Sequence, residues 1–155
     1  MSIKITKSEV FSFLDDLSSK RIVMMDGAMG TMIQKYRFEE EDYRGKEFKN
    51  HKTDLKGNND ILNITNIDSI KDVHKKYILS GADIIETNTF NGTSIAQQDY
   101  NLQNYVDEIN KSAVKAAKDA IKETASLVND KRILISGAFG PTNRTASISP
   151  DVEDP

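Results

Sequence analysis

Three short apolar runs constrain the fold of this chain more than any other feature of its sequence. They lie at residues 21–25, 82–87 and 132–136, and each is followed by a polar or glycine-rich segment. Apolar runs of this length are typical of buried strands, and stretches with helical spacing separate them. This alternation predicts a parallel sheet built from βαβ units, so we expect an α/β fold.

The spacing of apolar residues predicts the helices between the strands. Before the second strand, Asn66 is placed to cap the start of a helix and Gly81 to end it. Residues 37–59 are polar and show no period, so we expect a long loop there. The predicted helices, including a leading one and a short helical turn, span residues 8–17, 28–36, 67–80, 94–100 and 106–121.

Charge and composition exclude several classes of partner. The chain mixes 21 basic with 24 acidic residues, so no concentrated basic face is expected to bind nucleic acid. No apolar run approaches the length of a membrane span, and the N-terminus lacks a signal-like apolar segment. We therefore expect a cytoplasmic protein without membrane contacts. The absence of cysteine excludes disulfides and thiolate metal sites.

The segment that follows the first predicted strand, Asp26 to Thr31, combines a carboxylate with two glycines. Glycine lets backbone N–H groups approach a ligand closely, and a carboxylate beside them can pair with an ammonium group. Together these features suit an amino-acid ligand. A tight turn in which Asp26 caps a helix explains the same pattern.

A denser polar cluster, Glu86 to Asn91, follows the second predicted strand. A glutamate is rarely buried unpaired, so Glu86 is expected to face either a ligand or a structural cation. The ligand is the favoured interpretation, because polar groups converge at the carboxyl ends of parallel strands. In the alternative, the Thr and Asn residues finish the strand and cap the next helix.

Other polar residues carry weaker signals. Arg144, in the turn after the third strand, could pair with a carboxylate, but a lone loop arginine is more often solvated. His51 and His74 are the only histidines, and their positions do not match a metal-ligand spacing. The sequence contains no phosphate-binding loop and no serine nucleophile elbow.

Four segments, taken together, resemble the N-terminal homocysteine-binding module of cobalamin-dependent methionine synthases, within the homocysteine S-methyltransferase family. They are residues 24–34, 54–62, 81–91 and 140–155. The first and third would also occur in the wider family, whereas the second and fourth look like the cobalamin-dependent member. The resemblance covers residues 21–155.

This resemblance implies a fold and a domain division. The family folds as a (β/α)8 TIM barrel, and this chain would supply about the first three of the eight strands. Residues 1–20 would form a leading helix, and residues 21–155 would form a partial homocysteine-binding barrel domain that is truncated at its C-terminus. A different barrel enzyme such as an aldolase is disfavoured, because no lysine lies at a strand tip to form a Schiff base.

The resemblance also implies a function, the methylation of homocysteine to methionine. In the family a zinc ion, held by cysteines of late strands, lowers the pKa of the substrate thiol, while cobalamin and folate are bound by other modules. This chain has no cysteine. It is therefore expected to bind none of these cofactors and to be inactive alone. It would be either the substrate-binding segment of the enzyme or a non-catalytic, split-barrel subunit that needs a complementary chain.

Site residues follow from the same resemblance. Asp26 and Glu86 would meet the amino-acid end of homocysteine, and the local pattern independently favours these two. No catalytic residue and no metal ligand is assigned. The wall of the site would be completed by Gly27, Thr31, Thr87, Asn88 and Gly140.

Overall fold

A computed structural model describes residues 8–142 of the chain, and its sheet is parallel. Strand β1 (Ile84–Glu86) pairs with β2 (Leu134–Ser136), with Ile84 opposite Leu134 and Glu86 opposite Ser136. Helix α7 (Val106–Thr124) lies between them in sequence and provides the crossover that parallel strands require. The predicted α/β alternation is therefore confirmed for this part of the chain.

The first predicted strand is only partly formed. Residues 21–25 run parallel to β1, but within residues 8–142 they make a single bridge, between Met25 and Ile84. Hydrogen bonds from Asp83 N to Met24 O (2.7 Å) and from Asp26 N to Ile84 O (2.9 Å) hold this segment. It has a neighbour on one side only, and Ile22 is 82% exposed. The described sheet thus has two strands and a bridged segment instead of three strands.

The predicted helices are present, with shifted bounds. Ser8 caps the leading helix by accepting a hydrogen bond from Phe11 N (3.1 Å). The α-helices are α1 (Glu9–Lys20), α2 (Met29–Gln34), α3 (Glu40–Arg44), α4 (Leu62–Thr65), α5 (Ile67–Leu79), α6 (Ser94–Gln97) and α7. The 3-10 turns are η1 (Asn59–Ile61), η2 (Gln98–Tyr100), η3 (Gln103–Tyr105) and η4 (Ala125–Val128).

Two local predictions are wrong. The supposed loop at residues 37–59 contains α3, which begins with a capping box: the Glu39 side chain accepts from Asp42 N, and the Asp42 side chain accepts from Glu39 N (2.8 Å). Asn66 precedes α5 as predicted, but its side chain accepts from the Ser69 hydroxyl (2.8 Å) and caps no backbone N–H. By contrast, Gly81 has a φ of 105° just past the end of α5, which confirms the predicted C-terminal turn.

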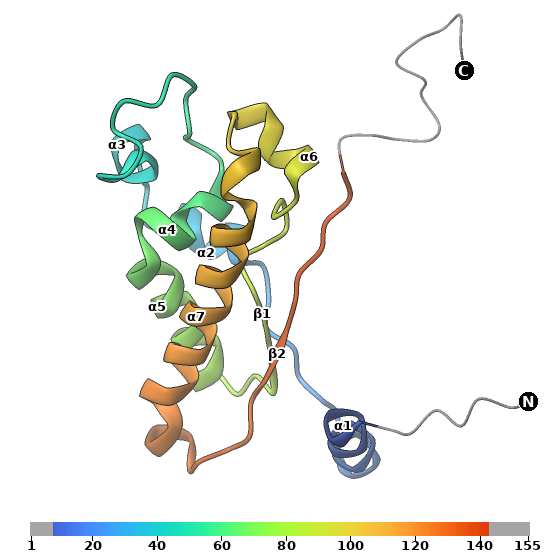
Figure 1. The fold of residues 1–155 in the computed structure, drawn as a ribbon. Coiled ribbons are helices and arrows are strands. Elements are labelled where there is room, and N and C mark those ends of the chain that lie inside the picture. Colours follow the sequence, from blue (N-terminus) through green and yellow to red (C-terminus); the bar gives the residue numbers. More distant parts are fainter. Residues whose placement is uncertain (1–7, 143–155) are drawn as a thin grey trace, which may run out of the picture.

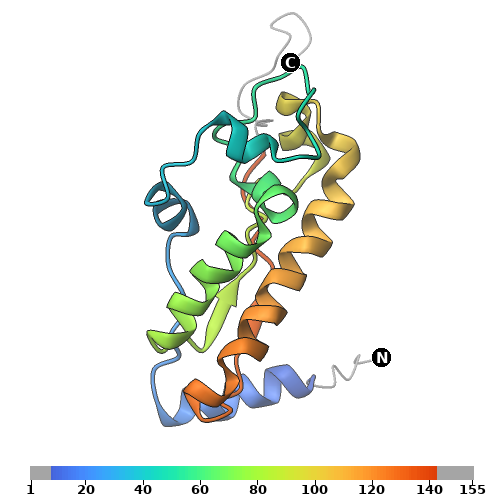
Figure 2. The same ribbon diagram turned by 90° about the vertical axis from the view of Figure 1, so that its left-hand side faces the viewer.

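Helices α5 and α7 lie side by side and cover one face of the strands (Figures 1 and 2). The face that α7 turns inward is rich in alanine, with Ala113, Ala116, Ala117 and Ala120 all buried. These small side chains allow a close approach to α5 and to Ile85 of β1, which belongs to the same apolar cluster as Ala117 and Ala120. No helix among residues 8–142 is long and apolar enough to cross a membrane.

Asp83 ties three chain segments together at the amino-terminal ends of the strands. Its side chain is only 2% exposed. It accepts two hydrogen bonds from the Arg21 guanidinium, each of 2.6 Å, and one from Met24 N (2.9 Å). It also forms an ion pair with Lys131 Nζ (2.6 Å). The Arg21 guanidinium, together with Lys131, holds the pKa of Asp83 well below its usual range. This carboxylate therefore fixes how the bridged segment and both strands start relative to one another.

The open edges of this sheet lead to a prediction about the isolated 155-residue chain. Ile22, Met24 and Met25 are exposed along one edge, and unpaired edge groups invite pairing with another chain. We expect the chain to self-associate, and Ile22→Lys to weaken that association at least roughly tenfold, because an edge lysine opposes strand addition. Sedimentation velocity over a concentration series measures both. A monodisperse wild-type monomer at every concentration would contradict the prediction.

Candidate functional site

A cavity of about 550 Å³ opens where the bridged segment and the two strands reach their carboxyl ends. In parallel α/β folds this is the end at which ligands bind. Three of the lining residues are acidic, and none of the described lining residues is basic. The lining residues are Asp26, Gly27, Ala28, Met29, Gly30, Asn59, Asp60, Glu86, Thr87, Asn88, Phe90, Asn91 and Ala138.

Asp26 lies at the cavity with one carboxylate oxygen uncommitted. Its Oδ2 accepts a hydrogen bond from Glu86 N (3.0 Å), whereas its Oδ1 is buried and has no partner among residues 8–142. Burial raises the pKa of Asp26 to about 6, and the negative charge of Glu86 adds to the effect. Ala28, not Asp26, occupies the N-cap position of α2, so the helix-capping interpretation of Asp26 is wrong.

Glu86 ends β1 and reaches the same cavity. Its side chain forms no ion pair with a lysine, arginine or histidine in the described part of the chain. Asp26 and Glu86, which are 60 residues apart in sequence, are thus brought together by the pairing of the bridged segment with β1. The result is a cavity with two neighbouring carboxylates, an arrangement that can pair with a cationic group of a ligand.

Asp60 is a third acid at the cavity, and sequence reasoning missed it. It lies on η1, is 1% exposed, and accepts a hydrogen bond from Asn91 N at Oδ1 (2.9 Å). Burial raises its pKa to about 6, against the opposing effect of the Asn91 N–H. The only signal in the sequence is an acid placed directly before the apolar pair Ile61 and Leu62.

Asn88 and Thr87 line the cavity but use their side chains to hold its walls. Asn88 Nδ2 donates to Asn59 O (2.7 Å), and Asn63 Nδ2 donates to Asn88 O (2.6 Å). Thr87 Oγ1 accepts from Ala138 N (3.1 Å). These bonds connect the loop after β1 to η1 on one side and to the end of β2 on the other.

Neither Thr87 nor Asn88 caps the helix that follows. Thr93 does so, because its hydroxyl accepts a hydrogen bond from Ala96 N (3.2 Å) at the start of α6. The alternative interpretation of the cluster after β1 is therefore right in part. Thr87 and Asn88 form structural hydrogen bonds after the strand, but neither caps the next helix.

The remaining predicted site residues occupy different surroundings. Gly27 lines the cavity, and a Cβ there would lie 3.2 Å from Tyr77 Oη. Thr31 is exposed on α2 and is not among the described lining residues. Gly140 donates to Phe90 O (3.0 Å), and a Cβ there would lie 2.6 Å from that oxygen, so it permits a close backbone approach beside the cavity. Arg144 lies outside the described residues.

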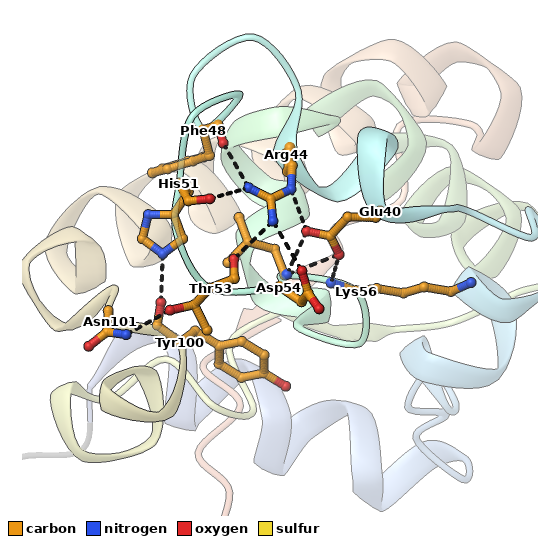
Figure 3. A network of polar contacts seen from close by, with 10 residues as sticks. Glu40, Arg44, Phe48, His51, Thr53, Asp54, Lys56, Tyr100 and Asn101 are labelled. Carbon is orange, nitrogen blue, oxygen red and sulfur yellow. Dashed lines mark hydrogen bonds and ion pairs between the residues drawn. The ribbon is translucent and has the colours of Figure 1, made fainter.

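A polar network organises the chain that leads into η1 (Figure 3). Arg44 donates to His51 O (2.5 Å) and Thr53 O (3.2 Å) and pairs with Glu40 (2.5 Å), which itself accepts from the backbone N–H of Leu55 (2.8 Å). Burial alone would raise the pKa of Glu40, but the backbone N–H groups of Leu55 and Lys56, together with Arg44, hold it below its usual value. These contacts hold the segment between Glu40 and Leu55 in place, and this segment leads directly into η1, which carries Asp60.

The described residues do not fit the zinc site that the resemblance implies. The chain has no cysteine, and residues 8–142 contain no group of three or more His, Cys, Asp or Glu side chains that could hold a metal ion. His74 is buried in the core, and His51 Nε2 lies 2.8 Å from Tyr100 O. The zinc chemistry therefore cannot be assigned to these residues.

Comparison with known proteins agrees with the family resemblance of the four sequence segments. The profile of the homocysteine S-methyltransferase family matches residues 23–155. Two solved structures of the homocysteine methyltransferase MmuM from Escherichia coli, a metallated and an oxidized form, superpose with TM-scores of 0.64 and 0.65 at 20% and 21% sequence identity. Each covers 83% of this chain, and the chain spans about 40% of their length (41% and 40%). At this identity the likeness to the two structures concerns the fold.

Proposed function

Because the chain belongs to the homocysteine S-methyltransferase family, we propose that it is the homocysteine-binding part of a cobalamin-dependent methionine synthase. The observation that carries this proposal is the acidic cavity at the carboxyl ends of the strands. Asp26 offers it a buried oxygen without a partner in residues 8–142, and Glu86 adds a second carboxylate. An amino-acid substrate supplies the ammonium group that these carboxylates lack.

The role proposed for this chain is to bind and orient its substrate. Asp26 and Glu86 pair with the substrate ammonium, and Gly27 and Gly30 line the same cavity beside Asp26. The hydrogen bond from Glu86 N to Asp26 Oδ2 (3.0 Å) fixes the Asp26 carboxylate before the ligand arrives. Since the chain has no cysteine and residues 8–142 do not fit zinc, the proposal assigns activation of the substrate thiol and methyl transfer to residues outside this chain.

The same proposal includes partners that complete the barrel. The exposed edge at Met25 and the outer edge of β2 are the places where further parallel strands would add. Those strands and the modules for cobalamin and folate are supplied by other residues of the enzyme. A split barrel, in which a separate chain adds to these edges, is the alternative, and mixing this chain with the later half of a related barrel distinguishes the two arrangements.

The proposed ammonium site gives a direct test on the chain. We expect Asp26→Asn and Glu86→Gln each to weaken L-homocysteine binding about tenfold, because each change removes a charge-assisted contact to the ammonium. Affinity in the wild type should rise as the pH increases through about 6, where Asp26 becomes ionised. NMR titration of the 155-residue chain measures both effects.

Two controls accompany this titration. Glu108→Gln removes the same charge from the exposed surface of α7 and should leave the affinity unchanged. The deaminated analogue 4-mercaptobutanoate, which lacks the ammonium, should bind wild type and both cavity variants alike. If Asp26→Asn and Glu86→Gln both kept the wild-type affinity for homocysteine, the two acids would have a structural role only.

A further inference from the structure

Asp60 brings a third carboxylate to the cavity from an element that neither Asp26 nor Glu86 belongs to. We propose that Asp60 is a further substrate-contacting residue, which pairs with the substrate ammonium and makes the site selective for amino acids over their deaminated analogues. This inference rests on the proposed function, and it adds a residue that the family resemblance did not supply.

The surroundings of Asp60 lack a counter-charge. Its side chain is 1% exposed, and its one hydrogen bond to another residue in the described part of the chain is the 2.9 Å bond from Asn91 N. No lysine, arginine or histidine within residues 8–142 pairs with it. Its own backbone N–H is the second donor to this carboxylate. A buried carboxylate is normally paired with a cation, and the ammonium group of a ligand would supply that counter-charge.

Asp60 is also held too rigidly to escape into solvent. On one side, Asn58 and Gln97 form a buried reciprocal amide pair, with Asn58 Nδ2 2.7 Å from Gln97 Oε1. On the other side, Asn59 O accepts from Asn88 Nδ2 (2.7 Å). The backbone that carries Asp60 is therefore fixed by its neighbours, and Asp60 keeps its place in the lining of the cavity before a ligand binds.

A purely structural role would not need the charge. The oxygen of an asparagine side chain at position 60 could accept the Asn91 N–H as well as a carboxylate does. If Asp60 served only to hold the loop after β1, Asp60→Asn would therefore be silent. This difference allows charge and shape to be tested separately.

The experiment is an NMR titration of the 155-residue chain with L-homocysteine and, separately, with 4-mercaptobutanoate. We expect Asp60→Asn to weaken homocysteine binding about tenfold, to leave the analogue unchanged, and to melt no lower than wild type. Asp60→Glu, which keeps the charge, should retain part of the preference for homocysteine. Asp60→Ala, which removes the charge and the acceptor, should weaken homocysteine binding and also lower the melting temperature.

Two results with Asp60→Asn would overturn the inference and leave the proposed function standing. If Asp60→Asn keeps the wild-type preference for homocysteine, or unfolds although an acceptor for Asn91 N remains, Asp60 is structural while Asp26 and Glu86 can still bind substrate. If wild type itself binds homocysteine no better than 4-mercaptobutanoate, the ammonium site is absent, and the proposed function fails with it.

Discussion

Asp83→Asn is expected to lower the free energy of unfolding by about 3 kcal/mol, because it removes two or more charge-assisted hydrogen bonds from a buried position. The Asp83 carboxylate accepts from Arg21, Met24 N and Lys131, and no other described side chain joins the starts of all three parallel segments. Asparagine keeps an acceptor for Met24 N but carries no charge. Urea unfolding followed by circular dichroism at pH 7 measures the change.

The matched control is Asp16→Asn on α1. Asp16 forms a 2.7 Å pair with Lys20, but both side chains are more than half exposed, so the same substitution should cost less than about 1 kcal/mol. Because the pKa of Asp83 is lowered in the folded chain, its contribution is present above the ordinary aspartate pKa and is lost as the pH falls below it. Equal costs for the two substitutions would show that Asp83 does not hold the strands together.

His74→Leu is expected to stabilise the chain, and to do so more strongly in acid. The imidazole is fully buried, and neither ring nitrogen has a hydrogen-bond partner among residues 8–142, so its polar atoms are a cost that leucine avoids. Burial lowers the pKa of His74 to about 4. The unfolded chain therefore binds a proton that the folded chain resists, and His74 destabilises the fold as the pH falls below about 6.5.

The size of this effect follows from the two pKa values. Between pH 7 and pH 5 the penalty from His74 grows by about 2 kcal/mol, and it levels off below the folded pKa. Wild type and His74→Leu should be compared by urea unfolding at both pH values. Asp26 and Asp60, whose raised pKa values act in the opposite direction, contribute equally to both proteins and cancel in the comparison. A stability difference that does not change with pH would contradict the prediction.

Periodic patterns made most of the fold predictable. Helices α5 and α7 follow from apolar spacing, and β1 and β2 follow from short apolar runs, because burial on a face leaves a period in the sequence. The bridged segment was overestimated, since residues 21–25 carry the composition of a buried strand without the neighbours on both sides that would complete it. Helix α3 was missed because charged pairs and a capping box, not an apolar stripe, stabilise it.

The candidate site was predictable only where it coincides with strand ends. Asp26 and Glu86 could be placed at one edge because parallel strands finish together, and the structure brings both to the cavity. Asp60 could not be found in this way, because it enters from a 3-10 turn whose position depends on the Arg44 and Glu40 network and on the Asn58 and Gln97 pair. Contacts of this kind join residues far apart in sequence and leave no local pattern.

The two oxygens of Asp26 have separate tasks, and this links strand pairing to ligand binding. Oδ2 accepts from Glu86 N and so fastens the bridged segment to β1, whereas Oδ1 has no partner among residues 8–142 and is the atom that we propose for the substrate ammonium. A cation at Oδ1 keeps the carboxylate ionised and strengthens its bond to β1. Coupling free energies are reciprocal. A strand that pairs with the open side of the bridged segment therefore raises the affinity for the ligand by the same factor by which the ligand raises the affinity for that strand. Under the proposed function, assembly of the sheet and affinity for substrate are therefore coupled, and either one can be used to shift the other.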